Sequence, residues 1–212
     1  MRGAVRVSVE DIPLISAIVE QARKVRFYVK VMKGEEILRR YFVMNAFDGA
    51  LTMLGIVLGA VMAGATNEKI IIGAGVSASF AMGVSGFVGA FMTEKAERER
   101  LIRELERALL TDLDDTMLGR ASLIVTIVAA VVDGASPALA ALTASVPFFL
   151  VSAGMLSFTQ AVYASLAIIL SMLTLLGAVL GKISQASVVR YSLVMVASGL
   201  LVALLSLLVG GH

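Results

Sequence analysis

The chain has 212 residues, of which 58% are apolar and 16% are charged, and its formal net charge is +2. Soluble domains are about 45–50% apolar and about 25% charged, so this composition disfavours a water-soluble enzyme, a disordered chain and a nucleic-acid-binding domain. Cysteine is absent and the only histidine is His212, which excludes a disulfide scaffold, a Ser-His-Asp triad and a histidine zinc site. We therefore expect a membrane protein that is not an enzyme, has no permanently bound cofactor and has no nucleic-acid partner.

The N-terminal segment, residues 1–40, is polar and basic and carries nine Lys or Arg residues. Within it, Ile12–Lys33 places apolar side chains at 3.6-residue spacing, which predicts an amphipathic helix. Such a basic helix suits the anionic surface of a membrane. It suits equally well a helix that docks on the membrane domain of its own chain, and both interpretations remain open.

Five apolar segments follow, each long enough to cross a bilayer, which takes about 20 residues of helix. The fold class is therefore predicted to be all-α: a polytopic membrane protein with five transmembrane helices and a short cytoplasmic helical segment between spans two and three. The spans are placed at Tyr41–Ala63, Ile70–Thr93, Ala121–Ser145, Phe158–Leu180 and Ser187–Val209. The resulting parts are residues 41–93 (spans one and two), 94–120 (the charged cytoplasmic helix) and 121–209 (spans three to five).

Positive charge is distributed very unevenly between the two sides of these spans. The N-terminal segment has nine Lys or Arg residues, the loop after span two has six and the loop after span four has two, whereas the other side holds only Lys69. Because Lys and Arg concentrate on the cytoplasmic side, we predict a multi-pass protein of the cell membrane. Its N-terminus lies in the cytoplasm, its C-terminus lies outside, and the lipid bilayer surrounds it.

The largest aqueous segment between spans is Glu94–Leu118, a run of helix-forming residues with interleaved charges. A solvated helix with ion pairs between residues four apart would by itself explain these charges.

Only two ionisable side chains lie at membrane depth, Asp48 and Asp133. Such a group is costly in hydrocarbon and is by default a functional hypothesis. On a helix, Asp48 shares a stripe about 80° wide with a thioether, a hydroxyl and two glycines; these are Met44, Thr52, Gly55 and Gly59, and Asn45 lies at its edge. Small residues let helices approach closely, so this stripe is expected to meet another helix. The alternative for Asp48 is a structural acid, hydrogen-bonded between helices.

The second span has a similar stripe, which carries Ser79 and Met82 and runs to Glu97 at its cytoplasmic end. Thioethers prefer softer metals and carboxylates accept hard ones, so the two spans together offer a mixed metal site. Without His or Cys the binding is expected to be moderate, which suits conduction. We predict metal ligands at Met44, Asp48 and Met82, with Asn45, Thr52 and Ser79 lining the pathway. The alternative for each methionine is a role as filler of an apolar core.

The second membrane acid, Asp133, lies close to Pro137, which removes a backbone hydrogen bond and predicts a kink in span three. An acid beside a kink is a proton site, a second ion site or the cap of a broken helix, and these alternatives remain open. The tripeptide Asp48-Gly49-Ala50 recurs as Asp133-Gly134-Ala135, which fits a parallel duplication.

Several of these segments resemble the vacuolar iron transporter family, over roughly Arg39–Gly210. The first span is similar to the Asp-Gly span of that family, the second to its Met-Gly-x-Gly span with an E-x-x-E helix, and the tail to its last two spans. The matching segments read YFVMNAFDGALTMLGIVLGA, SFAMGVSGFVGAFMTEKAERER and LGKISQASVVRYSLVMVASGLLVALLSLLVG. The chain thus looks like a prokaryotic member with a shortened cytoplasmic metal-binding segment.

This resemblance implies a five-span homodimer that exports ferrous iron (Fe²⁺), and often manganese (Mn²⁺), from the cytosol in exchange for protons. It implies an ion path along the dimer interface past Asp48 and Met82. It also implies cytoplasmic metal ligands at Glu94 and Glu97, with Glu104 and Glu106 as further candidates. Two other interpretations of the chain remain open: a membrane scaffold that transports nothing, and a transporter of another small cation.

Overall fold

A computed structural model describes residues 20, 23–30, 34–113 and 116–210, and its long elements are five helices. No β-strand occurs among these residues, and each long helix contains an apolar stretch able to cross a membrane. The helices are α2 (Gly34–Met62), α3 (Glu68–Leu109), α4 (Met117–Ser152), α5 (Phe158–Ile183) and α6 (Val188–Gly210). The predicted all-α fold with five spans is therefore confirmed.

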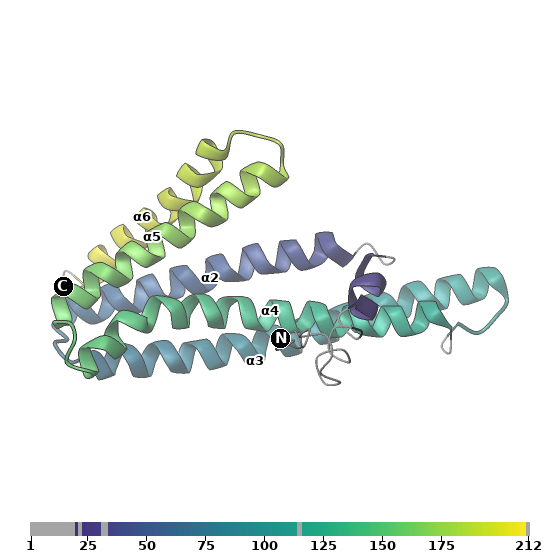
Figure 1. Ribbon diagram of the computed structural model, residues 1–212, viewed down its shortest axis with the longest axis horizontal. Helices are drawn as coiled ribbons and strands as arrows, with labels where there is room; N and C mark the ends of the chain where they lie inside the picture. The colour runs from purple at the N-terminus through teal and green to yellow at the C-terminus, as the bar shows by residue number, and fades with distance from the viewer. Residues whose placement is uncertain (1–19, 21–22, 31–33, 114–115, 211–212) are drawn as a thin grey trace, which may run out of the picture.

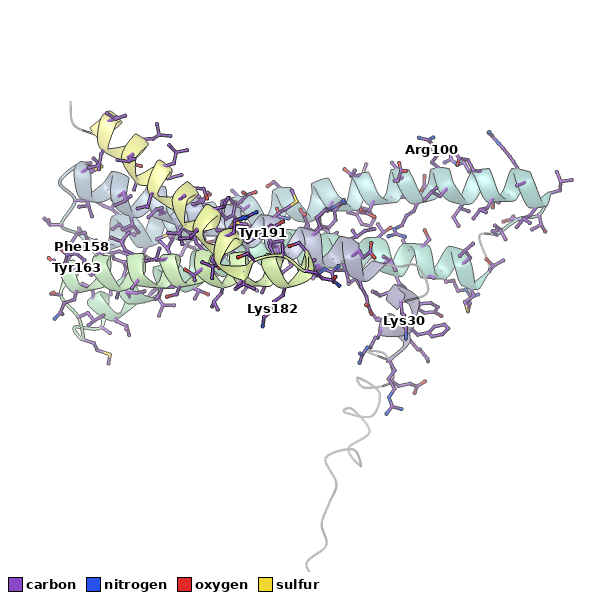
Figure 2. All side chains as sticks on the ribbon, turned by 90° about the horizontal axis from the view of Figure 1, so that it is seen from above. Lys30, Arg100, Phe158, Tyr163, Lys182 and Tyr191 are labelled. Carbon is purple, nitrogen blue, oxygen red and sulfur yellow. The ribbon has the colours of Figure 1, made fainter. Side chains whose placement is uncertain are left out.

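The helices form two antiparallel hairpins that meet along α2 (Figure 1). The α3–α4 hairpin packs along α2 and projects beyond the start of that helix (Figure 1). We call this projection the arm; it consists of residues 94–109 of α3 and 117–126 of α4. The α5–α6 hairpin packs on α2 from the end away from the arm as far as Val43 and Ala46, and it diverges from α2 toward the arm end (Figure 1). In Figure 2, Arg100 lies on the arm, whereas Phe158 and Tyr163 lie at the opposite end of the molecule.

The charged segment 94–120, predicted as a cytoplasmic helix between spans two and three, is helical over most of its length but is continuous with the spans on either side. Residues 94–109 continue α3 without interruption, and residues 117–120 already belong to α4. The stretch between Thr93 and Leu109 contains no glycine or proline and is rich in Glu, Arg, Leu and Ala, so nothing in it stops the helix that begins in the membrane. As a result α3 is one rod of 42 residues.

Glycines set the closest helix crossings. A Cβ atom added at Gly49 of α2 would collide with the backbone of Pro137 in α4, and one at Gly134 would collide with the backbone of Gly83 in α3. In the second hairpin, a Cβ atom at Gly177 would collide with the backbone of Ser192. These helices approach so closely because the crossing positions carry no side chain.

The main apolar core lies between α2, α4 and α5, on the side of the glycine crossings away from the arm. Its largest fully buried side chains include Met53 of α2, Phe148 of α4 and Leu173 of α5. Phe148 also stacks at an angle against Phe158, with ring centroids 6.1 Å apart. The core thus fixes the part of α2 that follows Asp48.

The third span, α4, passes through both Pro137 and Pro147 as a continuous helix. Asp133 therefore does not cap a broken helix, which removes one of the three interpretations of this residue. Hydroxyl groups near the prolines bond within the same helix: Ser136 donates to the carbonyl of Val132 and Ser145 donates to that of Ala141 at 2.7 Å. Such bonds satisfy hydroxyls that would otherwise be costly in hydrocarbon.

The predicted amphipathic helix over Ile12–Lys33 lies mostly outside the described residues. Residues 23–30 are helical, with Val29 buried and Phe27 exposed. Lys30 lies to the side of the helices, near the start of α2 (Figure 2). Whether this segment lies on a membrane or docks on its own chain stays a prediction.

Candidate metal pathway

The two membrane acids lie near each other at the α2–α4 crossing. Asp48 of α2 and Asp133 of α4 are close enough to interact electrostatically. Each acid is followed in sequence by one of the crossing glycines, Gly49 or Gly134. Because the helices approach closely at these glycines, each carboxylate lies at the edge of a helix–helix contact. We call Asp48 and Asp133 the carboxylate pair.

Asn45 is the polar link between the two helices of this pair. Its Nδ2 donates to Oδ1 of Asp133 at 2.6 Å and to the backbone carbonyl of Tyr41 at 2.8 Å. Both amide hydrogens are thereby used, which leaves the Asn45 side-chain oxygen as an acceptor beside the pair. Asn45, predicted from its place at the edge of the Asp48 stripe, therefore holds Asp133 in position.

Asp133 also reaches the third helix of the crossing. A Cβ atom added at Gly86 of α3 would lie 3.0 Å from Oδ2 of Asp133. The missing side chain at Gly86 thus provides the space that this carboxylate occupies, and α2, α3 and α4 all contribute to its surroundings.

The Asp48 stripe of α2 faces away from the rest of the protomer. Met44 is 58% exposed, Asp48 is exposed, and Cβ atoms added at Gly55 and Gly59 would meet no atom within 4 Å. We call these four residues the open stripe; Thr52, predicted on the same stripe, is half-buried beside it. A carboxylate and two bare glycines on an outer surface at membrane depth need a cover other than lipid, because a charged group facing hydrocarbon is costly.

The predicted stripe of the second span instead faces inward. Ser79 is 2% exposed, and its hydroxyl donates to the carbonyl of Gly75 at 2.7 Å. Met82 is half-buried and packs against the apolar core, which also contains Met53. The two predicted stripes therefore lie in different surroundings. Ser79 of α3 is inside the protomer, whereas Met44 of α2 is on its outer face.

The first arm carboxylate, Glu94, is engaged inside the protein. It is 9% exposed, and its Oε1 accepts a hydrogen bond from the hydroxyl of Tyr41 at 2.7 Å. Its Oε2 lies 3.3 Å from Nε of Arg98, which is also buried. The Arg98 contact follows from the i,i+4 spacing, but the Tyr41 contact joins residues 53 positions apart and has no signal in the sequence. Glu94 therefore ties the start of α2 to the arm.

Three of the other arm carboxylates, Glu97, Glu99 and Glu104, are exposed, and Glu99 and Glu104 pair with cations on the same helix, whereas the half-buried Glu106 accepts a hydrogen bond from the backbone N–H of Leu113. Glu104 bonds to Arg100 at 3.0 Å, and this hydrogen bond raises the pKa of the Arg100 guanidinium. Glu99 lies 3.7 Å from Lys95 and 3.2 Å from Arg103. These pairs match the solvated-helix interpretation of the segment. Within the part of the chain that the structure describes, no three His, Cys, Asp or Glu side chains gather closely enough to hold a metal ion.

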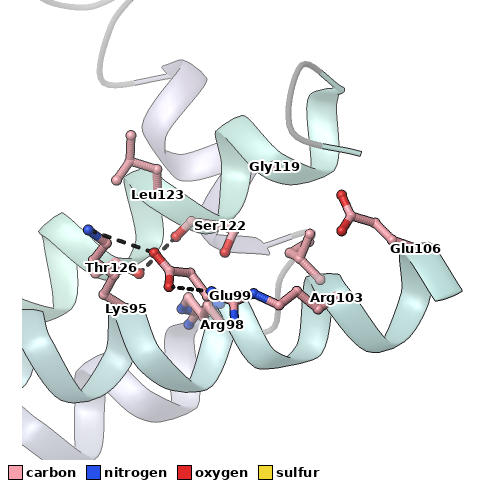
Figure 3. Close-up of a pocket in the computed structure, with 10 residues that line it drawn as sticks. Lys95, Arg98, Glu99, Arg103, Glu106, Gly119, Ser122, Leu123 and Thr126 are labelled. Atoms are coloured by element: carbon pink, nitrogen blue, oxygen red, sulfur yellow. Dashed lines mark hydrogen bonds and ion pairs between the residues drawn. The ribbon is translucent and has the colours of Figure 1, made fainter. Parts of the chain in front are cut away.

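A pocket of about 380 Å³ lies between the two helices of the arm. Figure 3 shows Glu99 beside Lys95 and Arg103 on α3, with Ser122 and Thr126 of α4 opposite. Its charged lining consists of Lys95, Arg98, Glu99, Arg103 and Glu106. Three positive and two negative side chains are mixed there, so the pocket offers no concentrated charge of either sign.

Replacing Glu94 by glutamine is expected to lower the free energy of unfolding by about 3 kcal/mol, because the buried Arg98 cation loses its partner. The matched control is Glu104→Gln, which breaks an exposed pair and should cost less than about 1 kcal/mol. Thermal unfolding of the detergent-solubilised protein, followed by helical circular dichroism, measures both. Equal midpoints for the two variants would contradict the structural role of Glu94.

Comparison with known proteins identifies the family. The VIT family matches residues 39–117, which include Asp48, Met82 and the α3 part of the arm. An uncharacterised protein of Methanocaldococcus jannaschii is 32% identical to this chain over 190 residues, which cover 88% of the chain and 95% of that relative. The likeness therefore extends from the matched helices through nearly the whole molecule. Together with the five apolar helices, these matches show that the chain is a multi-pass membrane protein that belongs to the VIT family.

Proposed function

We propose that the protein is a homodimeric, proton-coupled exporter of divalent transition metal ions, ferrous iron and also manganese, in the cell membrane. Membership of the VIT family supports metal ion transport in general. The observation that carries the specific proposal is the open stripe: Asp48 lies uncovered at membrane depth, on the same stripe as Gly55 and Gly59, where an added Cβ atom would meet nothing of the protomer within 4 Å.

A second copy of the chain is the cover that fits the open stripe best. Bare glycines permit the close approach of another helix, as they do at the crossings inside the protomer. Across a two-fold axis, the same stripe of each protomer would meet its copy. The Asp48 carboxylates of both protomers would then line a shared path, with Met44 supplying thioether sulfur on the same face.

Metal and proton compete for Asp48 in this mechanism. A divalent ion that has lost water binds the carboxylate of Asp48, with thioether sulfur from Met44 on the same stripe favouring softer transition metals. We also assign Met82 the role of a second thioether ligand, although within the protomer it packs against the apolar core. After the ion leaves, Asp48 takes a proton, since an uncompensated charge at this depth is costly. Asp133, held by Asn45, supplies a second negative charge near the path.

The direction of transport follows from the proposed orientation. In the predicted topology, seventeen Lys and Arg residues belong to segments on the arm side of the spans and one belongs to the other side, which favours an arm in the cytosol. Metal would then enter from the arm end and leave at the end where α2 meets α3. The arm glutamates Glu97 and Glu104 are exposed at that entrance and would bind metal only weakly, since Glu104 already pairs with Arg100.

Transport by purified protein in liposomes tests this proposal. We expect ferrous iron and manganese to move against a proton gradient, and calcium and magnesium to move far less. The chain has no cysteine, so single substitutions report the orientation of the reconstituted protein: Asn67→Cys should react with an impermeant reagent from the side opposite Glu104→Cys. Absence of any metal flux from folded protein would favour a scaffold, and equal flux of calcium would favour a transporter of another cation.

A further inference from the structure

A second feature of α2 lies on the side that faces the α5–α6 hairpin. A crevice of about 270 Å³ opens there at the arm end, where the hairpin diverges from α2 (Figure 1). Its walls are apolar side chains of three helices: Val43 and Phe47 of α2, Leu180 and Ile183 of α5, and Met195 of α6. The exposed Met44, at the edge of the open stripe, also borders the crevice, so the two features of α2 adjoin each other at this residue. The volume is below the range of small-molecule pockets, about 300–1,000 Å³, and suits part of one hydrocarbon chain.

Charged side chains gather at one end of this crevice. Arg39, Arg40 and Glu36 complete its lining, so its mouth carries two positive charges and one negative charge. Arg39 makes no ion pair with any residue that the structure describes. The guanidinium of Arg40 lies 5.6 Å from the ring centroid of Tyr41, with which it interacts, and it has no carboxylate partner among the described residues. The mouth therefore suits a single negative group.

The spacing of these groups along α2 matches the dimensions of a lipid. Met44 lies about one helical turn, roughly 5 Å, beyond Arg40, and Phe47 lies about one turn further. Lipid headgroup layers are about 5–8 Å deep on each side of the hydrocarbon. An anion bound to the arginines would thus lie at headgroup depth, with apolar walls continuing directly into the hydrocarbon.

We propose that this crevice is a binding site for one anionic phospholipid, with its phosphate on Arg39 and Arg40 and part of one hydrocarbon chain between α2 and the α5–α6 hairpin. Basic pockets between membrane helices on the cytoplasmic side are a known setting for anionic headgroups. The inference uses the orientation proposed above, because anionic lipid is enriched in the cytoplasmic leaflet, but it does not depend on metal transport. The bound lipid would fill the space that the diverging hairpin leaves open and would fix its distance from α2.

Native mass spectrometry of the detergent-purified protein tests the site. The probes are phosphatidylglycerol and phosphatidylcholine with identical chains. We expect phosphatidylglycerol to be retained at least about tenfold more strongly, and the preference to vanish in the Arg39→Gln, Arg40→Gln double variant. The matched control is Arg190→Gln, which removes a positive charge from the same end of the molecule but outside the crevice. Equal retention of the two lipids, or an equal loss in the control, would overturn the proposal.

A second measurement locates the hydrocarbon chain and keeps the test independent of the arginines. Ile183→Trp adds bulk at the wall of the crevice, where the native side chain is 37% exposed, and should weaken phosphatidylglycerol retention. Val189→Trp adds the same bulk at a position that is 67% exposed and outside the crevice, and should leave it unchanged. If Ile183→Cys instead forms a disulfide between two protomers, the crevice is an interface between copies and the lipid proposal fails. Metal transport without lipid selectivity would leave the proposed function intact and reject only this site.

Discussion

Replacing Asp48 by asparagine is expected to reduce proton-coupled metal transport to background while the protein stays folded and dimeric. Asparagine keeps the shape of the side chain but removes its negative charge and its titratable proton, so neither the ion nor the proton can bind. No folded-state partner is lost, because Asp48 accepts no hydrogen bond from another described residue and lies on the outer face of α2. Metal uptake into liposomes under a proton gradient measures the loss.

The control for this experiment removes a carboxylate elsewhere. Glu68→Gln acts at the start of α3, at the end of the molecule away from the arm, where the native side chain accepts a hydrogen bond from Ser152. We expect its transport to stay within about twofold of the parent protein. Full proton-coupled transport by folded Asp48→Asn protein would end the mechanism proposed here. Lost stability with intact transport would instead identify Asp48 as a structural acid.

Adding a single methyl group at Gly49 or Gly134 is expected to lower the stability of the protomer by about 2 kcal/mol. Overpacking typically costs about 1–3 kcal/mol, and here the added carbon would meet helix backbone, which has no alternative rotamer to adopt. Alanine gains up to about 1 kcal/mol over glycine in a helix interior, but that gain is smaller than the cost of separating two helices. Thermal unfolding of Gly49→Ala and Gly134→Ala measures the balance.

Gly73→Ala is the matched control, because a Cβ atom there would meet nothing within 4 Å. This variant should gain the higher helix propensity of alanine without any collision, so its midpoint of thermal unfolding should be unchanged or raised. A midpoint for Gly49→Ala as high as that of Gly73→Ala would show that the α2–α4 crossing is looser than the structure indicates.

The number of spans could be predicted from sequence because each apolar run is long enough for a bilayer. The end of α3 could not, because helix propensity continues across Glu94–Leu109 whether or not hydrocarbon surrounds it. The change from apolar to charged residues near Thr93 marks where the helix passes from hydrocarbon to water, and the helix itself continues across that point.

The candidate site was predictable only in part. Periodicity placed Asp48 and Asn45 on neighbouring positions of one helix, but it does not tell which face meets which neighbour. The open stripe of α2 therefore faces outward, whereas Ser79 on the similar stripe of α3 is buried. The contact of Tyr41 with Glu94 depends on how α2 and α3 pack together, which no local pattern encodes. The repeated Asp-Gly sequence, which fits a parallel duplication, occurs at two close helix crossings: Gly49 lies against α4, and Gly134 lies against α3.

The position of the α3–α4 connection has a consequence for how the length of the chain can vary. Both helices of the arm continue past the start of α2, and α3 ends at the tip of the arm, far from the glycine crossings (Figure 1). Exposed loop tips are the places where insertions are best tolerated. Adding helices at this tip, or removing whole turns from both helices of the arm together, would leave the carboxylate pair and the open stripe unchanged. The size of the aqueous part and the packing in the membrane can therefore change independently of each other.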